Sequence, residues 1–333
     1  TILPDTTALS NDCTSVSFVI LTYNHECYIQ AAIQGALEQT YSPLEIIISD
    51  DCSTDGTYDT ILQAVRNYRG PHMVKINRNS RNIGIVAHHN KVLSELATGD
   101  FIVEAGGDDI SFPERTSTLV AAYHASGASL FGSDYEVIDS YNRLISKKMH
   151  VPRRNRICYD SLAQIGLFDS GYHGSTIAFD KSLYVDFGPL PSNVLAEDFS
   201  LISRASLLNG CLYIDKPLVM RRIHEENQSL PLQVHNTRTI PEFLELYRNH
   251  LLDRVHNGIN FIQLLNNQKT YGSTASKRDR AISRLRHHIE KIELELAMLD
   301  HRFLNRLYLL MTNMSMLLKW DRQMLRISMA ALG

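Results

Sequence analysis

Four carboxylates stand out because each lies just beyond an apolar run of strand length. They are Asp50, Asp51, Asp108 and Asp109. The preceding runs, at 44–48 and 101–103, are rich in isoleucine, valine or phenylalanine. In open α/β sheets, ligands bind beyond the carboxyl ends of the strands. Because crowded carboxylates repel one another, they need a cation or hydroxyl groups as partners, and a nucleotide-sugar bound with a divalent metal ion supplies both.

The stretch 106–109, Gly-Gly-Asp-Asp, is the stronger candidate for a metal site. Its two glycines allow a ligand to approach the backbone closely, and Asp108 and Asp109 have no basic neighbour in the sequence. Carboxylate oxygens suit Mg²⁺ or Mn²⁺ beside a pyrophosphate, where the ion would offset charge on a leaving diphosphate. A solvated acidic turn is the alternative interpretation.

The stretch 49–57 is a candidate for binding a nucleoside. Asp50, at the end of its strand, can accept hydrogen bonds from a base or a ribose. Pairing with the first strand would bring Thr22, Tyr23 and Asn24 beside it, and the Tyr23 ring offers a flat face for a base. Ser, Asp, Thr and Gly also make ordinary turns, so a purely structural turn is an equally good interpretation.

Two further groups lie in the second half of the chain. Glu197 and Asp198 begin an amphipathic helical pattern. Asp198 is suited to remove a proton from an acceptor hydroxyl, although the helix dipole alone also favours acidic residues there. His224 follows Arg221 and Arg222, whose guanidinium groups can hold phosphate oxygens. For His224, a metal or phosphate contact and a structural role are equally open.

The elements that would position these groups alternate in the first half of the chain. Strands are predicted at 16–21, 44–49, 74–76 and 101–103, and helices at 28–39, 57–68, 82–96 and from 113 onward. This alternation predicts right-handed βαβ units and a parallel sheet. The second half is mixed, with strands predicted at 129–138 and 175–179, a helix at 197–208 and a short edge strand at 212–214.

From about Pro241 the sequence is almost entirely helical, with a polar break at 266–277. A heptad seam runs over 282–303. Its members are Ile282, Leu285, Ile289, Ile292, Leu296, Leu299 and Phe303. The tail can pack onto the rest of the chain, join two copies in a coiled coil, lie on a membrane surface or connect to a further domain. The membrane option concerns an apolar run at 307–318 and its basic neighbours, which are Arg302, Arg306, Lys319, Arg322 and Arg326.

Length and composition limit the class of protein. With 333 residues, 44% hydrophobic and 21% charged, the chain suits one large α/β domain and a smaller appendage. A net charge of −3 lacks the basic footprint of a nucleic-acid-binding protein. Five scattered cysteines without C-x-x-C spacing argue against a zinc site and a disulfide framework. With no signal-peptide pattern and no run of about 18 apolar residues, a cytoplasmic protein is expected.

Several motifs, taken in order, resemble those of family-2 glycosyltransferases, which are inverting enzymes with the nucleotide-sugar-binding, Rossmann-like GT-A fold. The motifs are Ser17–Asn24, Ser49–Thr57, Asn82–Gly84 with Asn90, Gly107–Glu114, Glu197-Asp198 and Arg222–His224. Each is moderately specific alone, but six in the expected order are a strong signal over residues 15–230. The resemblance implies a GT-A domain with a mostly parallel central sheet at 16–235. The polar stretch 1–15 is predicted to be a leader, and 236–333 is predicted to be a helical extension.

The resemblance also implies a role for each residue singled out above. The nucleotide-sugar donor would be held by Thr22, Tyr23, Asn24, Asp50, Asp51, Asn82, Asp108 and Arg222. The metal, Mn²⁺ or Mg²⁺, would be held by Asp108, Asp109 and His224, and Asp198 would be the catalytic base. Two positions depart from the family pattern. Gly106 replaces the first Asp of the D-x-D motif, and His88-His89 replace the Ala-Arg pair that often precedes Asn90.

The implied reaction is one in-line displacement with inversion at the anomeric carbon. A nucleotide-sugar, UDP-linked for preference, would donate to a glycan or lipid-linked acceptor in bacterial surface-polysaccharide synthesis, such as capsule or lipopolysaccharide O-antigen. The C-terminal helices would form a homo-oligomer or contact the inner face of the cytoplasmic membrane.

Three other functions compete with this interpretation. A nucleotidyltransferase would need a loop with glycine and Lys or Arg after the first strand, and a dinucleotide-dependent oxidoreductase would need G-x-G-x-x-G there. Residues 22–26 contain neither pattern. A non-catalytic scaffold protein that keeps the GT-A fold and assembles partners through its helical tail stays open because of Gly106.

Overall fold

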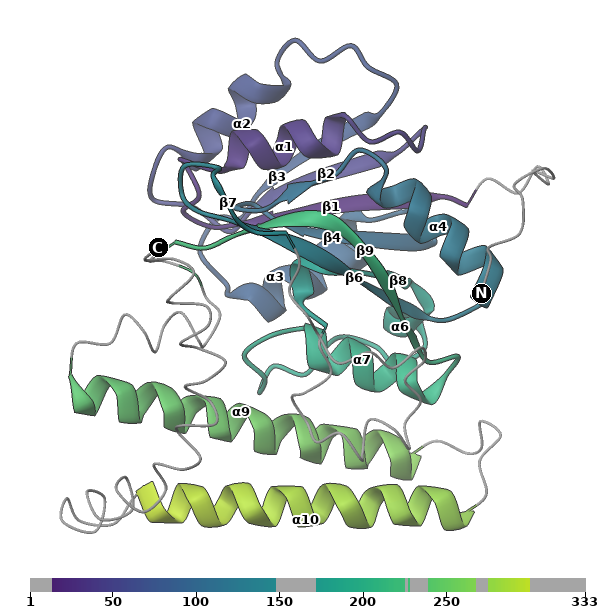
Figure 1. Cartoon of the computed structure of the whole chain (residues 1–333), viewed down its shortest axis with the longest axis vertical. Helices are drawn as coiled ribbons and strands as arrows, with labels where there is room; N and C mark the ends of the chain where they lie inside the picture. The colour runs from purple at the N-terminus through teal and green to yellow at the C-terminus, as the bar shows by residue number, and fades with distance from the viewer. Residues whose placement is uncertain (1–13, 148–171, 225–226, 228–238, 268–274, 300–333) are drawn as a thin grey trace.

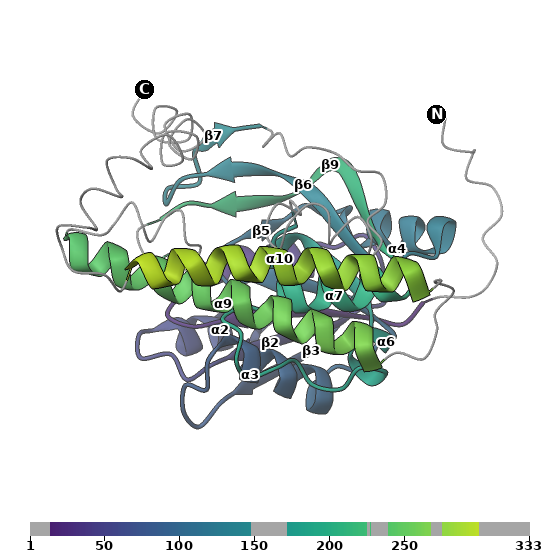
Figure 2. The ribbon, with the colours of Figure 1, turned by 90° about the horizontal axis from the view of Figure 1, so that it is seen from below.

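The computed structural model describes residues 14–147, 172–224, 227, 239–267 and 275–299. Over these ranges one curved sheet lies between two layers of helices, and a pair of long helices adds an outer layer on one side (Figure 1). A view from below shows the two long helices side by side across that face (Figure 2).

Nine strands form the sheet, in the order β3-β2-β1-β4-β8-β6-β9-β5, with β7 paired to β6. The first four strands in this order are parallel, as the alternating sequence pattern predicts. β8 then runs antiparallel between β4 and β6. The bounds are β1 (Val16–Thr22), β2 (Glu45–Asp50), β3 (Met73–Arg78), β4 (Phe101–Gly106), β5 (Ile110–Ser111), β6 (Leu130–Ile138), β7 (Leu144–Ser146), β8 (Ile177–Asp180) and β9 (Cys211–Arg222).

Helices cover both faces of the sheet, with α1, α2 and α4 on one side and α3, α6 and α7 on the other (Figure 1). Successive strand residues point to opposite faces, so Phe18 and Ile46 belong to one apolar core and Val19 and Ile47 to the other. The helices are α1 (Ile29–Leu37), α2 (Thr57–Val65), α3 (Ile85–Lys91) with the π-helical η1 (Val92–Leu96), α4 (Arg115–Ser126), the 3-10 turn η2 (Gly174–Thr176), α6 (Ser182–Val185) and α7 (Asp198–Leu207).

The strand register brings the predicted acidic stretches to one edge of the sheet. Thr22 of β1 pairs with Asp50 of β2, and Leu21 pairs with Gly106 of β4. The chain just beyond stays joined, because the amide of Asp51 donates to the Thr22 carbonyl over 2.9 Å and the amide of Gly107 donates to the Leu21 carbonyl over 2.9 Å.

One predicted strand differs clearly from its counterpart in the structure. The prediction of a short edge strand at 212–214 is wrong, because β9 has 12 residues and lies between β6 and β5. Its charged residues and Pro217 resemble a turn in the sequence. The register with β6 shifts between Ser133 and Tyr135, and such an irregularity lets a proline sit within a sheet. The longer strand carries the chain to Arg222 beside β4.

The outer layer consists of α9 (Ile240–Asn267), which contacts α7, and α10 (Ala275–Leu299), which contacts α9. The first seam residues, Ile282 and Leu285, belong to the same apolar cluster as Phe261 of α9 and Leu201 of α7. Within the described part of the seam, packing onto the rest of the chain therefore accounts for the burial. Phe303, the run at 307–318 and the basic residues around it lie outside the described residues, as does most of the predicted leader.

Within the ranges that the structure describes, no helix combines the length and the apolar character that a membrane span requires.

Candidate active site

A glycine allows the loop after β1 to lie against the loop after β4. A β-carbon placed on Gly107 would lie 2.4 Å from Thr22 Oγ1 and 2.7 Å from His25 Nδ1. Both distances are shorter than van der Waals contact, so any larger residue would push the two loops apart. Thr22 is buried, and its Oγ1 lies 3.2 Å from His25 Nδ1. The close approach places the His25 ring beside Asp108.

His25, Asp108 and His224 form the metal-binding candidate. One ligand atom from each lies within 4.8 Å of the others. The Asp108 carboxylate is 3.2 Å from His224 Nε2, and it also accepts a hydrogen bond of 3.2 Å from the Asn227 side chain. Burial alone would raise the pKa of Asp108, but the hydrogen bond from His224 and the charge of His25 lower it. An ionised carboxylate with two imidazoles is a set that a divalent ion can use.

At position 106, where the family pattern has an Asp, this chain has a glycine. The carboxylate of Asp108 occupies part of the space that a side chain at position 106 would take. A β-carbon at position 106 would lie 2.6 Å from Asp108 Oδ1. A side chain there would therefore require Asp108 to adopt another orientation. In the metal-binding candidate the carboxylate oxygen belongs to Asp108, and His25 offers a ring nitrogen that the sequence motifs did not identify.

Asp109, predicted as a metal ligand, lies outside this cluster. Its carboxylate accepts a hydrogen bond of 2.7 Å from the backbone amide of Arg222. Burial and the neighbouring charge of Asp108 raise the pKa of Asp109 to about 6. In the structure, Asp109 joins the end of β4 to the end of β9, which brings His224 alongside Asp108.

Arg222, predicted to hold the donor, is 1% exposed. Its guanidinium donates to the backbone carbonyl of Asp108 over 2.8 Å and to that of Asp139 over 2.9 Å, and it lies 4.8 Å from the centre of the Tyr28 ring. These contacts give Arg222 a clear structural task, which is to hold the loop after β4 in place.

The predicted nucleoside contacts shape the neighbouring loops. Asp50 is fully buried, accepts hydrogen bonds from Ser53 and pairs with Arg78 over 3.3 Å. The side chain of Asn24 accepts a hydrogen bond of 2.9 Å from the amide of Thr54. The structural interpretation of this stretch therefore explains these side chains without a ligand, and donor contacts by them stay a prediction.

Asp51 and Asn82 act at the start of α3. The Asp51 carboxylate accepts from the Asn79 side chain over 2.8 Å, from the Ile83 amide over 3.0 Å and from the Gly84 amide over 2.9 Å. Asn82 is exposed and accepts from the same Gly84 amide over 3.0 Å. Both side chains hold the turn before α3. Tyr23 is half-buried at the strand edge, so its ring stays a candidate for base stacking.

Asp198, the predicted base, is the first residue of α7 and is half-buried. Burial raises the pKa of its carboxyl to about 6; Asp253 and Glu104 add to the effect, while the Phe199 amide and Arg221 oppose it. Burial, with the charges of Glu104 and Asp198, raises the pKa of the adjacent Glu197 further, to about 8.

Arg221 connects the two acidic regions electrostatically. Its charge lowers the pKa of both Asp109, at the end of β4, and Asp198, at the start of α7. The charge of Arg221 therefore acts on both carboxylates although 89 positions separate them in the sequence.

The two histidines that depart from the family pattern have separate partners. His88 lies 2.6 Å from Ser49 Oγ, and His89 forms an ion pair with Glu104 of β4. Both members of that pair are buried, and Glu104 raises the pKa of His89 against the effect of burial. A charged residue inside the apolar run of β4 was the signal that could have indicated this pair.

Comparison with known proteins bears on the family of the chain. Residues 17–186 match the family described as Glycosyl transferase family 2. The putative glycosyltransferase EpsE of Bacillus subtilis is 38% identical over 111 residues, which cover 33% of this chain and 39% of EpsE. WfgD of Escherichia coli, a UDP-Glc:α-D-GlcNAc-diphosphoundecaprenol β-1,3-glucosyltransferase, is 28% identical over 172 residues, or 52% of this chain and 62% of WfgD. The chain thus spans less than two thirds of either relative.

Solved structures share the fold. The mannosyltransferase PcManGT of Pyrobaculum calidifontis, in complex with GDP-Man and Mn²⁺, aligns with a TM-score of 0.59 over 99% of this chain and 88% of its own, at 16% sequence identity. The match to the family covers more than half of the chain. The chain belongs to glycosyl transferase family 2.

Proposed function

We propose that this family-2 glycosyltransferase transfers a sugar, with inversion and with a divalent metal ion, from a nucleotide-diphosphate donor to a hydroxyl of a glycan or lipid-linked acceptor. The observation that carries the proposal is the approach of His25, Asp108 and His224 at the carboxyl ends of the strands. A donor diphosphate bound at this edge would meet these ligands, and the charge of Arg221, the residue before Arg222, acts on Asp198.

The metal ion would be Mn²⁺ or Mg²⁺. Two imidazole nitrogens beside one carboxylate favour Mn²⁺, since Mg²⁺ prefers oxygen ligands and water. When bound, the ion would act as a Lewis acid that offsets charge on the departing diphosphate. The name of WfgD specifies UDP-Glc, which supports a UDP-linked donor, and the complex of PcManGT contains Mn²⁺, which supports the choice of ion.

Asp198 is the proposed base. With a pKa of about 6 it is largely ionised at neutral pH, yet basic enough to take a proton from a hydroxyl as that oxygen attacks. Glu197, with a pKa of about 8, is protonated at the same pH and cannot compete as the base. Attack from the face opposite the diphosphate inverts the anomeric carbon.

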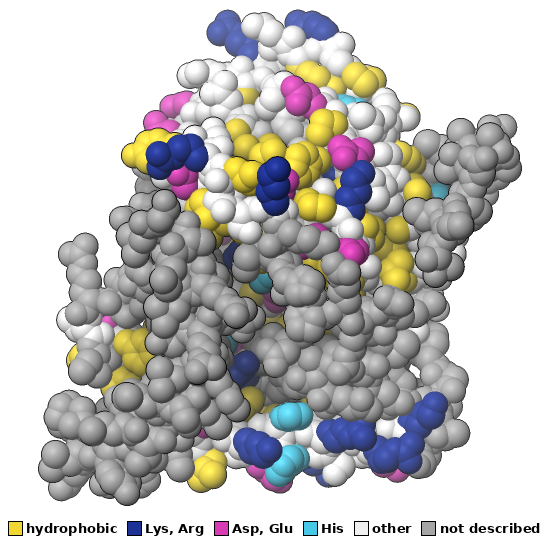
Figure 3. Space-filling model, in the orientation of Figure 1, with side chains coloured by type: hydrophobic (Ala, Val, Ile, Leu, Met, Phe, Trp, Pro, Cys, Tyr) yellow, Lys and Arg dark blue, Asp and Glu magenta, His cyan; other side chains and the backbone are white. Residues whose placement is uncertain are grey.

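A lipid-linked acceptor would place the protein at the inner face of the cytoplasmic membrane, and one surface of α10 supports this part of the proposal. Lys277, Arg280, Arg284 and Lys291 are exposed and recur at spacings of three, four and seven, which places them on one side of the helix. Lys and Arg side chains gather over α10 at the bottom of Figure 3. Each such residue near an anionic membrane contributes ~1 kcal/mol to binding.

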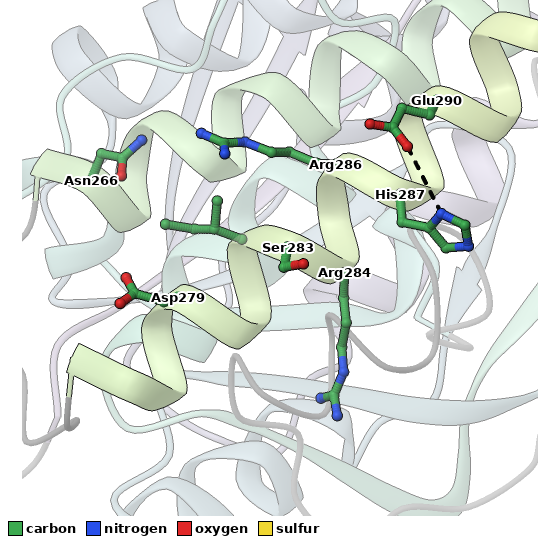
Figure 4. A pocket seen from close by; sticks show the side chains of 8 residues that line it. Asn266, Asp279, Ser283, Arg284, Arg286, His287 and Glu290 are labelled. Atoms are coloured by element: carbon green, nitrogen blue, oxygen red, sulfur yellow. Dashed lines mark ion pairs between the residues drawn. The ribbon is translucent and has the colours of Figure 1, made fainter.

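An open hollow of about 710 Å³ lies along the same helix. Asn266 of α9 and residues of α10 line it, and Arg284 and Arg286 project to opposite sides (Figure 4). None of its described lining residues belongs to the metal cluster or the α7 terminus. We therefore expect the basic side chains of this hollow to contact anions at the protein surface, and we do not assign the hollow to the nucleotide-sugar.

Two measurements test the transferase proposal. In a thermal-shift assay, UDP with Mn²⁺ should raise the Tm more than either alone, because His25, Asp108 and His224 would hold the ion and the ion would favour binding of the diphosphate. Mass spectrometry of acceptor glycans incubated with a panel of nucleotide-sugars should then reveal a product heavier by one sugar. Absence of both results would reject the proposal.

Flotation with vesicles tests the membrane contact. Phosphatidylglycerol vesicles should bind the protein at low salt, phosphatidylcholine vesicles should not, and binding should weaken as salt screens the charges. Replacing Arg280, Arg284 and Lys291 with serine should remove the binding. Equal binding to both vesicle types would exclude the electrostatic contact.

A non-catalytic scaffold protein is the second candidate, and the observation that favours it is Gly106 in place of an acidic ligand. It would keep the fold and use α9 and α10 to assemble partners. Stabilisation by UDP that does not depend on Mn²⁺, together with no turnover of any donor, would favour this alternative.

A further inference from the structure

The helical extension contacts the segment that carries Asp198. Three side chains of α9 take part, and they recur at spacings of four and three, so they lie on one face of the helix. Asp253 accepts a hydrogen bond of 2.6 Å from the backbone amide of Leu195. Asn257 accepts one of 3.3 Å from the Ser200 hydroxyl.

The third contact lies at the outer end of this row. Asn260 donates a hydrogen bond of 3.0 Å to the side chain of Asn193. Together the three contacts reach from Asn193 to Ser200, on both sides of Asp198. The position of Asp198 relative to the sheet is therefore determined in part by a helix that lies outside the stretch matched to the family.

Asp253 is the first member of the row and is 7% exposed. Its second oxygen accepts a hydrogen bond of 3.1 Å from the side chain of Asn257. A carboxylate removed from water in this way needs such donors, because burial without them is unfavourable. The donors that stabilise it are an amide of the Asp198 segment and a neighbour on its own helix.

We propose that Asp253 is a positioning residue for the catalytic carboxylate: by holding the Leu195 amide, it sets the place of Asp198 beside the bound acceptor. The inference rests on the proposed transferase function and on the role of Asp198 as base. It makes the helical extension a working part of the active site and not only an outer layer.

The charge of Asp253 also acts on the base. After burial, its negative charge is the largest contribution that raises the pKa of Asp198. The other charged groups facing Asp198 are Glu104 of β4, which acts in the same direction, and Arg221 of β9, which opposes it. The adjacent Glu197 also interacts with Asp198, whose charge raises the pKa of Glu197. Burial raises the pKa of Asp253 itself, whereas the hydrogen bonds that it accepts and the charges of His256 and Arg254 favour its ionised form. Removing the Asp253 charge should therefore lower the pKa of Asp198.

Two substitutions separate geometry from charge. Asp253→Asn keeps an oxygen for the Leu195 amide but removes the charge, so kcat should stay within a few-fold while the acid limb of its pH profile moves to lower pH. Asp253→Ala removes the acceptor, and kcat should fall by about 10- to 100-fold because the base is misplaced. Glu245→Gln, on an exposed position of α9, is the matched control and should change neither quantity.

Donor affinity, measured by calorimetry with UDP and Mn²⁺, should be unchanged in all three variants. An Asp253→Ala protein that keeps its cooperative unfolding and the wild-type kcat would overturn the inference. So would an equal loss of kcat and donor affinity, because that pattern indicates general damage to the site.

A measurement without turnover separates this inference from the proposed function. The Asp198 carboxyl can be titrated by NMR of ¹³C-aspartate protein and assigned by its absence in Asp198→Asn. Its midpoint should move to lower pH in Asp253→Asn, and an unmoved midpoint would reject the coupling even in an active enzyme. By contrast, full turnover by Asp198→Asn would reject the proposed base itself.

Discussion

Different parts of the molecule support the two halves of the candidate site. One half is the metal-binding candidate, His25, Asp108 and His224, and the other is the start of α7, which carries Asp198. His25 and Asp108 lie on loops that backbone hydrogen bonds and a close glycine hold to the parallel strands. Asp198 begins a helix whose approach to the sheet is fixed from the far side by α9. Damage to the sheet edge should therefore affect metal and donor binding, whereas damage to α9 should affect the chemical step.

Among the tests of this comparison, the largest effect is expected when the proposed base, Asp198, is replaced. Asp198→Asn should reduce kcat by roughly 10²- to 10⁴-fold, because proton removal from the acceptor is lost. Donor affinity, measured by calorimetry, should stay within about twofold of the wild type. An equal loss of donor affinity would indicate that Asp198 contributes to metal and donor binding and not to proton removal.

The second test compares two adjacent carboxylates at the end of β4. Asp108→Asn removes an ionised ligand, so the Mn²⁺-dependent rise in Tm should disappear and activity should fall by about 10²-fold or more. Asp109→Asn should keep that rise, because this side chain accepts from the Arg222 amide and lies outside the metal-binding candidate. Equal loss of Mn²⁺ dependence in both variants would restore Asp109 as a ligand.

The third test concerns the stability of the sheet edge. Asp51→Ala leaves the Ile83 amide and the buried Asn79 side-chain amide without their acceptor, which should reduce the free energy of unfolding by about 2–4 kcal/mol. Urea denaturation measures the loss. Glu95→Ala, at an exposed position, is the control and should lie within about 0.5 kcal/mol of the wild type. A similarly small change for Asp51→Ala would show that the turn before α3 does not depend on it.

The last test concerns a pH dependence of stability from Glu197. Its folded pKa of about 8 lies above the ordinary value of 4.5, so the folded state holds this proton over a range in which the unfolded state releases it. The contribution to stability is therefore full below pH 4.5 and declines as the pH rises toward 8. Glu197→Gln should make urea midpoints depend less on pH over this range. An unchanged dependence would show that Glu197 ionises normally.

The parallel half of the fold could be predicted because its signals are local. The runs at 16–21 and 44–49 are apolar and β-branched, and each appears as a strand within a residue or so. The strand ends could be expected to meet, since parallel strands share one edge. By contrast, β9 was underestimated because Pro217 interrupts its pattern and only pairing with β6 reveals its length.

The residues of the candidate site also differ in whether the sequence alone could identify them. Asp108, Asp198 and His224 could be named from motifs, because each stands next to a recognisable element boundary. His25 could not, because its proximity to Asp108 follows from the close packing at Gly107. The structural tasks of Asp51 and Arg222 were hidden for a related reason, since their partners are backbone amides and carbonyls of distant residues.

From its amino-acid order alone, this chain specified the alternation of its first half, the acidic strand ends and a helical tail with an apolar seam. These features depend on side-chain periodicity and on neighbours within a few positions. The tertiary structure alone decided that His25 joins Asp108, that Asp109 binds a backbone amide and that α9 holds the Asp198 segment. Each of those outcomes depends on distances between residues far apart in the chain, which packing sets and a linear pattern does not encode.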